Sequence, residues 1–383
     1  MKKYKVAYVT GSRADYGIVK KYLRLLDQDE EIDFSVLVTG SHLEEKFGNS
    51  IDIIREDGFH IGYEASLYID NDTNAKVIHS MAIALDSFGA FFESHKFDLI
   101  ILLGDRYEIM SVAIAAAMQR VPILHLHGGE VTYGNYDEFI RHSITKMSQY
   151  HFTSTEIYKK RVIQLGEAPD RVFCLGALGA ENCLEIDSKR VKKEIKILSP
   201  KKYWVIAFHP ETLTEVGVEN QIQEVLAAVD GEKGKHNLVF MGTNADTGSD
   251  IIRQTWLKYV KVHTNMYYFE NLNVDSFLYL VKNSIALIGN SSSGIIEAPS
   301  LGVYTINIGD RQKGRVRGNS VIDVACNKTQ IVQAMRQAYS WSEKSIKINN
   351  PYYKENAAVE YYQKTKEILK GKTKIVKEFY DFS

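Results

Sequence analysis

Small polar residues follow an apolar run in the second half of the chain, where the sequence reads Gly289-Asn-Ser-Ser-Ser-Gly294. The apolar run 285–288 is typical of a buried strand, and 294–297 predicts the start of a helix. A Gly/Ser turn between a strand and a helix presents backbone N–H groups and the positive end of the helix dipole to an anion. We therefore expect Ser291 and Ser292 to bind a phosphate, although a plain serine cap of the helix fits the same residues.

Charged residues near this turn indicate which anion it holds. An arginine on the following loop, Arg311 or Arg315, would add a guanidinium to a phosphate. Glu297 would repel a phosphate, but a carboxylate there suits the hydroxyl groups of a ribose, as in other nucleotide sites. The segment therefore predicts a nucleoside diphosphate held by its phosphates and its sugar.

Carboxylates follow apolar strands in the first half of the chain. Asp105 and Arg106 come directly after the apolar run 98–103. Burial at the end of a strand would raise the pKa of the Asp105 carboxyl and suit it to general acid or base work. A helix cap is the alternative role for this aspartate. Glu130 follows the next apolar run, 122–126, and is a second candidate carboxylate.

His125 and His127 lie on one face of that predicted strand, close to Glu130. A metal site is one interpretation of these residues. Glu130 lies off the strand, however, and no fourth ligand is evident, so we favour a buried, hydrogen-bonded role for His125.

Asp137 and Arg141 lie four residues apart in a predicted helix and share a face, and His142 adds a further polar group. An ordinary surface ion pair has the same spacing and contributes only about 0.3–0.5 kcal/mol. A functional role is favoured because Asp105, Glu130 and this helix all follow strand ends on one side of the predicted sheet.

Further polar residues follow other predicted strands. His209 ends the strand 203–208, and as a cation it would neutralise a leaving diphosphate. Asn244 and Asp246 follow the next strand and indicate either a contact to a base or sugar, or a plain turn. Arg13 lies in the turn after the first strand. It could bind a phosphate there, or it could be a solvated cation on the surface.

Short apolar strands alternate with helical patterns along the chain, which predicts two doubly wound α/β domains. The strands are expected at 5–10, 32–38, 98–103, 122–126, 150–153, 203–208, 237–241, 266–269, 285–288 and 304–308. A charged stretch near 187–194 interrupts the alternation, so we place the domains at 1–185 and 186–352. Ligands bind such sheets at the carboxyl ends of the strands, and the cleft between the domains is the expected site.

The bulk composition excludes several classes of protein. The formal net charge of −1 over 383 residues leaves no broad basic surface for nucleic acid. No apolar run approaches the length of a membrane helix, and no secretory signal opens the chain. The 3 cysteines are scattered, which favours reduced thiols and a cytoplasmic enzyme. The absence of a GxGxxG motif argues against a dinucleotide cofactor.

Taken in order, the polar motifs resemble the hydrolysing UDP-N-acetylglucosamine 2-epimerases, bacterial enzymes that start sialic acid synthesis. The similar segments are GSRADYG (11–17), GDRYE (104–108), HLHGGE (125–130), DEFIRHSITKMS (137–148), FHPET (208–212), NADTGSD (244–250), GNSSSGIIE (289–297) and GDRQKGR (309–315). The resemblance implies two Rossmann-like domains of the GT-B type, with a C-terminal helix, 353–383, that packs back on the first domain. It also implies a homodimer or homotetramer and no cofactor or metal.

The resemblance implies the reaction and the roles of the residues. UDP is eliminated from UDP-N-acetylglucosamine to give 2-acetamidoglucal, which is hydrated to N-acetylmannosamine. The catalytic residues implied are Asp105, Glu130, Asp137, His209 and His127, and the substrate-binding residues are Arg13, Arg106, Arg141, His142, Asn244, Asp246, Ser291, Ser292, Glu297 and Arg311. His127 stands where non-hydrolysing relatives carry a catalytic glutamate, so the acid and the base remain unassigned among the carboxylates and His127.

Three other functions fit the same sequence. The same chemistry on a UDP-2,4-diacetamido-trideoxy sugar is the nearest, and no residue separates the two substrates. A GT-B glycosyltransferase would share the fold. A nucleotide-sugar binding protein without turnover is disfavoured, because carboxylates gathered at one site would repel a diphosphate.

Overall fold

The computed structural model describes residues 3–45, 49–67, 73–133, 136–196, 198–211, 216–232, 234–243, 248–344, 347–371 and 376–381. The chain divides into two compact units. The first unit comprises residues 1–130, 137–178 and 354–383, and the second comprises 131–136 and 179–353. The main division therefore lies between Leu178 and Gly179, a few residues before the boundary expected from the charged stretch.

The first unit is built on a parallel sheet of 7 described strands in the order β3-β2-β1-β4-β5-β6-β7. The strands are β1 (Tyr4–Thr10), β2 (Ile32–Thr39), β3 (Ile61–Ala65), β4 (Leu99–Leu103), β5 (Ile123–Leu126), β6 (Tyr150–Thr153) and β7 (Val172–Cys174). The helices are α1 (Arg13–Asp27), α2 (Ile51–Glu56), α3 (Asn74–Ser94), α4 (Tyr107–Met118), α5 (Asp137–Met147), α6 (Glu156–Gln164) and α14 (Ala357–Lys370), and α7 (Leu178–Asn182) begins at the division.

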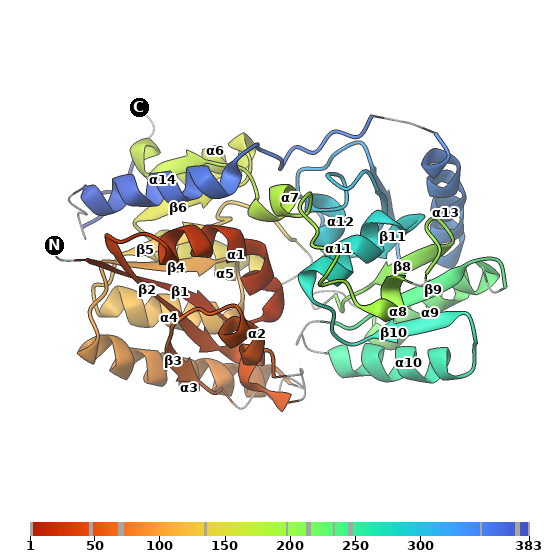
Figure 1. The fold of residues 1–383 in the computed structure, drawn as a ribbon, viewed down its shortest axis with the longest axis horizontal. Coiled ribbons are helices and arrows are strands. Elements are labelled where there is room, and N and C mark those ends of the chain that lie inside the picture. The colour runs from red at the N-terminus through yellow and green to blue at the C-terminus, as the bar shows by residue number, and fades with distance from the viewer. Residues whose placement is uncertain are drawn as a thin grey trace. The chain divides into compact units, whose positions relative to one another are not determined.

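Helices cover both faces of this sheet (Figure 1). On one face, alternate residues of β1 such as Val6 and Tyr8 pack in a core with α1 and α14. Tyr22 of α1 and Tyr361 of α14 meet edge to face, with their ring centroids 5.6 Å apart. The C-terminal helix α14 is therefore part of the core of the first unit. Helices α3, α4 and α5 pack beside one another on the opposite face.

The second unit has a parallel sheet of 6 described strands in the order β10-β9-β8-β11-β12-β13. The strands are β8 (Tyr203–Ala207), β9 (Asn237–Met241), β10 (Met266–Phe269), β11 (Ala286–Gly289), β12 (Tyr304–Ile308) and β13 (Val321–Val324). The helices are α8 (Lys193–Lys196), α9 (Val218–Val229), α10 (Ser249–Lys261), α11 (Val274–Lys282), α12 (Ser293–Ile296) and α13 (Lys328–Ser342). Alternate residues of β8 enter different cores, Trp204 and Ile206 on one face and Tyr203 and Val205 on the other, which explains its unbroken apolar run.

Both sheets reverse their strand order at one place, between β1 and β4 in the first unit and between β8 and β11 in the second. In doubly wound sheets the carboxyl ends of the strands at such a switch point form the ligand site. The chemistry is therefore expected in the segments that leave these strands, which begin at Gly11, Gly104, Phe208 and Asn290.

The edge strands β3, β7 and β13 were not expected from the sequence. Most residues of β3 and β13 are partly buried or exposed, and β7 has 3 residues. A short or half-exposed edge strand has no long apolar run, so the pattern that predicted the central strands does not detect it.

The expectation that nothing in the chain is long and apolar enough to span a membrane is wrong for α3. Among the described residues, α3 meets that test by length and composition. The helix reaches this mean hydropathy through its aliphatic, Met, Phe and Ala residues, although His79, Asp86 and several serines interrupt them, so no continuous apolar run was visible. Core helices of soluble proteins pass the same test, and Ala84, Phe88 and Phe92 of α3 are buried in the first unit.

Candidate active site

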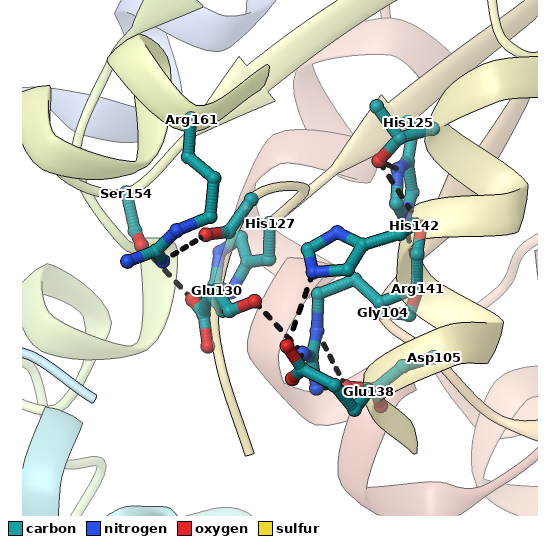
Figure 2. A network of polar contacts seen from close by, with 12 residues as sticks. Gly104, Asp105, His125, His127, Glu130, Glu138, Arg141, His142, Ser154 and Arg161 are labelled. Atoms are coloured by element: carbon teal, nitrogen blue, oxygen red, sulfur yellow. Dashed lines mark hydrogen bonds and ion pairs between the residues drawn. The ribbon is translucent and has the colours of Figure 1, made fainter. Parts of the chain in front are cut away.

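Asp105 lies where β4 ends at the switch point of the first sheet, and Arg141 of α5 reaches it (Figure 2). Arg141 Nε donates to Asp105 Oδ2 at 2.9 Å, and Nη2 donates to the same oxygen. The sequence led us to expect a buried acid or base here. The structure instead places a guanidinium on the carboxylate, and an adjacent positive charge favours the ionised form.

Arg141 connects several parts of the site. Its side chain is 1% exposed. Besides binding Asp105, Nη1 donates to the backbone oxygen of Glu130 at 2.9 Å and to Glu138 Oε2 at 3.1 Å. Nε, Nη1 and Nη2 thus all donate to protein acceptors. The geometry supports a positioning role for Arg141 more directly than the expected contact to substrate.

Glu138 is a site residue that the sequence analysis missed. It contacts Arg141 with one oxygen and His142 Nε2 with the other, at 3.2 Å (Figure 2). The signal was present, because Glu138 stands three residues before Arg141 and four before His142, and both spacings bring helical side chains together. Asp137, chosen from the sequence, is the first residue of α5 and is half-buried.

The turn after β5 is tightly constrained. His127 has φ of 64°, in the left-handed region that non-glycine residues rarely adopt. A Cβ at Gly129 would lie 2.5 Å from the backbone oxygen of Tyr158, so only glycine fits there. Strain of this kind persists where the surrounding structure enforces it, and it is frequent at functional sites.

This turn places Glu130 inside the first unit. The side chain of Glu130 is 2% exposed, and its Oε1 accepts a hydrogen bond from Ser154 at 2.9 Å. His127 Nδ1 lies 3.5 Å from the same oxygen (Figure 2). This separation fits an ion pair when the imidazole is protonated, and it is longer than an ordinary hydrogen bond. Ser154, which follows β6, gave no signal in the sequence beyond its place after a strand.

His125 has a structural role. Its Nε2 lies 2.8 Å from the backbone oxygen of Gly104, and its Nδ1 lies 3.1 Å from Thr145 Oγ1. Burial lowers the pKa of His125 to about 3, so the ring is neutral. Both nitrogens contact protein groups, as the preferred interpretation required. The described residues contain no group of three or more His, Cys, Asp or Glu side chains placed to hold a metal.

The turn after β1 differs from the expectation. Helix α1 begins at Arg13, so this arginine stands in the first helical turn and not in an extended loop. Ser12 and Asp15 form a capping box, which explains why α1 begins early.

The turn after β4 orients a second candidate ligand. Arg106 Nε donates to Glu108 Oε1 at 2.5 Å, so a carboxylate fixes this arginine. Burial raises the pKa of Glu108, while Arg106 opposes the increase.

In the second unit, Asn290 connects the two strands of the switch point. Its Oδ1 accepts from the backbone N–H of His209 at 2.7 Å, and its Nδ2 donates to the backbone oxygen of His209 at 2.9 Å. Gly289, with φ of 139°, brings the chains this close, because a Cβ there would overlap the backbone of Ala207. His209 is thereby fixed at the carboxyl end of β8, with 7% of its surface exposed.

The loop after β12 is held against the same residues. Arg311 Nη1 and Gln312 Nε2 donate to the backbone oxygen of Asn290 at 3.1 and 2.8 Å. Glu211 Oε1 accepts from the backbone N–H of Asp310 at 2.8 Å. Arg311 and His209, the two expected diphosphate ligands, are therefore both anchored through Asn290.

The helix expected after the serine turn is only one turn long. Helix α12 spans Ser293–Ile296 and ends before Pro299, which cannot continue a helix and disfavours helical geometry in the residue before it. Ser291 and Ser292 are half-buried at its start. A helix this short has a weak dipole, so any anion binding here would depend on the hydroxyl groups and nearby cations.

Glu297 directly follows α12 and is 7% exposed. Its carboxylate lies over Gly179, where a Cβ would overlap it. Burial and the nearby charge of Glu297 raise the pKa of the Cys183 thiol to about 12. The two other candidates in this unit, Asn244 and Asp246, lie outside the described residues.

Two doubly wound parallel sheets in one chain, each with polar side chains at its switch point, define an α/β protein of the GT-B type. A sequence profile of UDP-N-acetylglucosamine 2-epimerase matches residues 24–366. The chain belongs to the UDP-N-acetylglucosamine 2-epimerase family, a family of UDP-sugar 2-epimerases.

Individual relatives agree with this assignment. "Polysialic acid biosynthesis protein P7" of Escherichia coli is 50% identical over 383 residues, covering 98% of this chain and 97% of the relative. "GDP/UDP-N,N'-diacetylbacillosamine 2-epimerase (hydrolyzing)" of Campylobacter jejuni is 37% identical, covering 85% and 86%. The structure of the UDP-GlcNAc 2-epimerase of Neisseria meningitidis bound to UDP-GlcNAc has a TM-score of 0.77 at 20% identity, covering 95% and 100%. The last match shows the likeness of fold.

Proposed function

We propose that this chain is a hydrolysing UDP-N-acetylglucosamine 2-epimerase, which converts UDP-N-acetylglucosamine and water to N-acetylmannosamine and UDP. The observation that carries the proposal is the group of carboxylates at the switch point of the first sheet, where Asp105 and Glu138 bind Arg141 and Glu130 lies beside His127. The name of the 50% identical relative, a polysialic acid biosynthesis protein, supports it, because N-acetylmannosamine is a precursor of sialic acid.

In the elimination step a base removes the proton from carbon 2, and the bond from carbon 1 to the UDP oxygen breaks. Asp105 is suited to be this base, because Arg141 favours its ionised form. The electron pair of the broken bond passes to the diphosphate. His209 and Arg311 of the second unit would stabilise that charge, with Arg13, Arg106, Ser291 and Ser292 as further phosphate ligands and Glu297 on the ribose.

In the hydration step a proton adds to carbon 2 from the opposite face and a hydroxyl group adds to carbon 1. The pair His127–Glu130 is suited to this exchange, because one of the two groups can give a proton to carbon 2 while the other takes the proton that the attacking water loses. Asp137 and His142, at the start of α5, are the remaining candidates for an acid or base. The reaction as written balances without a cofactor or a metal.

A second substrate is supported by two other relatives. The Campylobacter jejuni protein and its Legionella pneumophila counterpart, 37% and 35% identical to this chain, are named as hydrolyzing 2-epimerases of diacetylbacillosamine nucleotides. The same elimination and hydration would apply to that UDP-2,4-diacetamido-trideoxy sugar. The higher identity of the polysialic acid relative favours UDP-N-acetylglucosamine.

The test is product analysis in deuterated water with the two UDP-sugars in parallel. We expect UDP to be released from UDP-N-acetylglucosamine and deuterium to appear at carbon 2 of N-acetylmannosamine. Faster release from the diacetamido sugar would reassign the substrate. UDP release only in the presence of a sugar acceptor, without deuterium at carbon 2, would identify a glycosyltransferase instead.

We also propose that the enzyme works in the cytoplasm. The described structure has free thiols at Cys174, Cys183 and Cys326, which fits a reducing compartment.

A further inference from the structure

Helix α6 and the segment that leads into it contact the turn that carries Glu130 (Figure 2). Arg161 Nη1 of α6 donates to the backbone oxygen of Gly129 at 2.5 Å. Ser154 Oγ donates to Glu130 Oε1 at 2.9 Å. A Cβ at Gly129 would lie 2.5 Å from the backbone oxygen of Tyr158, so the turn lies directly against α6. One region of the first unit therefore touches this turn at three points.

Two arginines hold successive carbonyl groups of the turn. The carbonyl of Gly129 accepts from Arg161 of α6. The next carbonyl, that of Glu130, accepts from Arg141 Nη1 of α5 at 2.9 Å. Both His127 and Gly129 have a positive φ, 64° and 77°, and a non-glycine residue in that region persists only where its surroundings enforce it. Guanidinium groups from two different helices therefore support the shape of this turn.

The two arginines differ in what else they contact. Arg141 also binds Asp105, the proposed base of the elimination step, so a change at Arg141 would affect both steps of the reaction. Arg161 lies over the ring of Tyr158, with Cζ 5.4 Å from the ring centroid. Tyr158 is fully buried, and its ring supports the guanidinium by a cation–π contact. Within the described part of the chain, Arg161 thus connects α6 to the turn of Glu130 and leaves Asp105 untouched.

We propose that Arg161 is a positioning residue for the hydration step. The inference rests on the proposed function, in which water adds its oxygen to carbon 1 of 2-acetamidoglucal. The water loses a proton to one member of the His127–Glu130 pair, and the other member gives a proton to carbon 2. Both groups must be correctly placed against the bound sugar, and a misplacement of about 1 Å can lower a rate by about 10²-fold. Arg161 acts on both groups through the turn, because it binds the carbonyl of Gly129, which lies between them in the sequence.

The ratio of the sugar products tests this role. In the parent chain, one N-acetylmannosamine should appear for each UDP released. Arg161→Ala should lower the formation of N-acetylmannosamine by about 10–10²-fold and that of UDP by much less, because elimination still proceeds at Asp105. The difference should appear in solution as free 2-acetamidoglucal, which NMR of the products measures. Arg161→Lys should restore most of the N-acetylmannosamine, because an ammonium also donates a hydrogen bond to a carbonyl.

Arg24→Ala is the matched control. Arg24 lies in the last turn of α1, donates to the backbone oxygen of Asp57, and lies over the ring of Phe59 with Cζ 4.1 Å from the centroid. It has the same two kinds of contact as Arg161, in the same unit, but at the end of α1 that points away from the switch point. Arg24→Ala should lower stability to a similar degree and leave the ratio of products unchanged. Urea unfolding measures the stability of each variant.

Two more variants keep the test independent of one substitution. If Arg161→Ala does not fold, Arg161→Met provides the same comparison, because it keeps most of the apolar stem and removes the donors. Ser154→Ala removes the donor to Glu130 Oε1 and should shift the ratio of products in the same direction as Arg161→Ala.

The possible outcomes separate this inference from the proposed function. A parent chain that releases no UDP from either UDP-sugar would overturn the proposed function and the role of Arg161 together. In an active parent chain, a folded Arg161→Ala or Arg161→Met variant that loses UDP and N-acetylmannosamine in equal proportion would overturn the role of Arg161 alone. Unchanged rates in that variant would overturn it as well.

Discussion

The two switch points of this chain are organised by different interactions. In the first unit, charged groups bind one another. Arg141 donates to both Asp105 and Glu138, and Arg106 donates to Glu108. In the second unit, the neutral side chain of Asn290 fixes the backbone of His209 and accepts through its own backbone from Arg311.

The difference fits the division of labour in the proposed reaction. Proton transfer at carbon 2 needs acids and bases whose ionisation is set by neighbouring charges. A departing diphosphate needs cations, and the neutral Asn290 holds both His209 and Arg311, although the Glu211 carboxylate also accepts from the backbone of the Arg311 loop. Charge pairing at the first site and amide bonding at the second therefore place different chemistry on two sheets of the same topology.

The largest effect is expected from removing the charge of Asp105. Asp105→Asn keeps the shape of the side chain but removes the proposed base, so kcat for UDP release should fall about 10²–10⁴-fold. A coupled assay for UDP measures it, with Glu130→Gln and His127→Ala as companions. A full rate in Asp105→Asn would exclude this aspartate as the base, and full rates in both companions would exclude the His127–Glu130 pair.

Asn290→Ala should disturb the second unit more than any charge change there. It removes two hydrogen bonds to the backbone of His209 and leaves buried groups unpaired, at about 1–3 kcal/mol each. Urea unfolding should show a loss of about 2–6 kcal/mol, and KM for UDP-N-acetylglucosamine should rise.

Asn265→Ala is the control for this prediction, because Asn265 Nδ2 donates a single bond, 3.0 Å from the backbone oxygen of His236, in the same unit. If the two variants unfold at the same urea concentration, Asn290 does not have the proposed role at the switch point.

Acid should destabilise the first unit, because ion pairs also hold the C-terminal end of α5. Lys377 donates to the backbone oxygen of Lys146 at 3.0 Å and contacts Glu167 at 2.6 Å, and Glu167 also binds His151. Burial alone would raise the pKa of Glu167, but hydrogen bonds from His151, Lys146 and Lys377 lower it to about 2. Burial lowers the pKa of His151 below its usual value.

The signs of the two shifts agree. A carboxylate with a depressed folded pKa contributes stability above its unfolded pKa of about 4.5, and this is lost as the pH falls towards 2. A histidine kept neutral by burial loses stability once the pH falls below about 6.5. We expect the unfolding free energy to decrease by about 2–3 kcal/mol between pH 7 and pH 3, and by less in Glu167→Gln. Hydrogen exchange of α5 that is insensitive to acid would contradict this.

The central strands of both sheets were predictable because they are buried on both faces and read as unbroken apolar runs. The fold class followed from their alternation with helices, and it is confirmed. Glu108 shows what such patterns miss. Nothing in GDRYE indicates that Glu108 is fully buried and bound to Arg106, because that contact depends on how the turn after β4 folds.

The positions of the candidate residues were predictable, since polar residues directly after strands meet at one edge of a parallel sheet. The side chains that they contact were harder to predict. Asp105 and Arg141 are separated by 36 positions, and only the packing of α5 beside β5 and α4 brings them together. The one-turn length of α12 fits Pro299, a residue that ends helices and stands a few positions after the serine turn.

The smallest effect is expected at Glu138, the carboxylate that local spacing could have found. Glu138→Gln keeps the shape but weakens the bonds to Arg141 and His142, and loss of one charge-assisted bond of about 1.4 kcal/mol corresponds to a tenfold lower kcat. Glu156→Gln on α6, at an exposed glutamate of the same unit, is the matched variant. If Glu138 acts by positioning Arg141, its variant should shift the pH profile in the same direction as Arg141→Lys, while Glu156→Gln should not. A rate unchanged in Glu138→Gln would show that Asp105 alone orients the guanidinium, and the contrast between a charge-paired first site and an amide-held second site would then rest on that single pair.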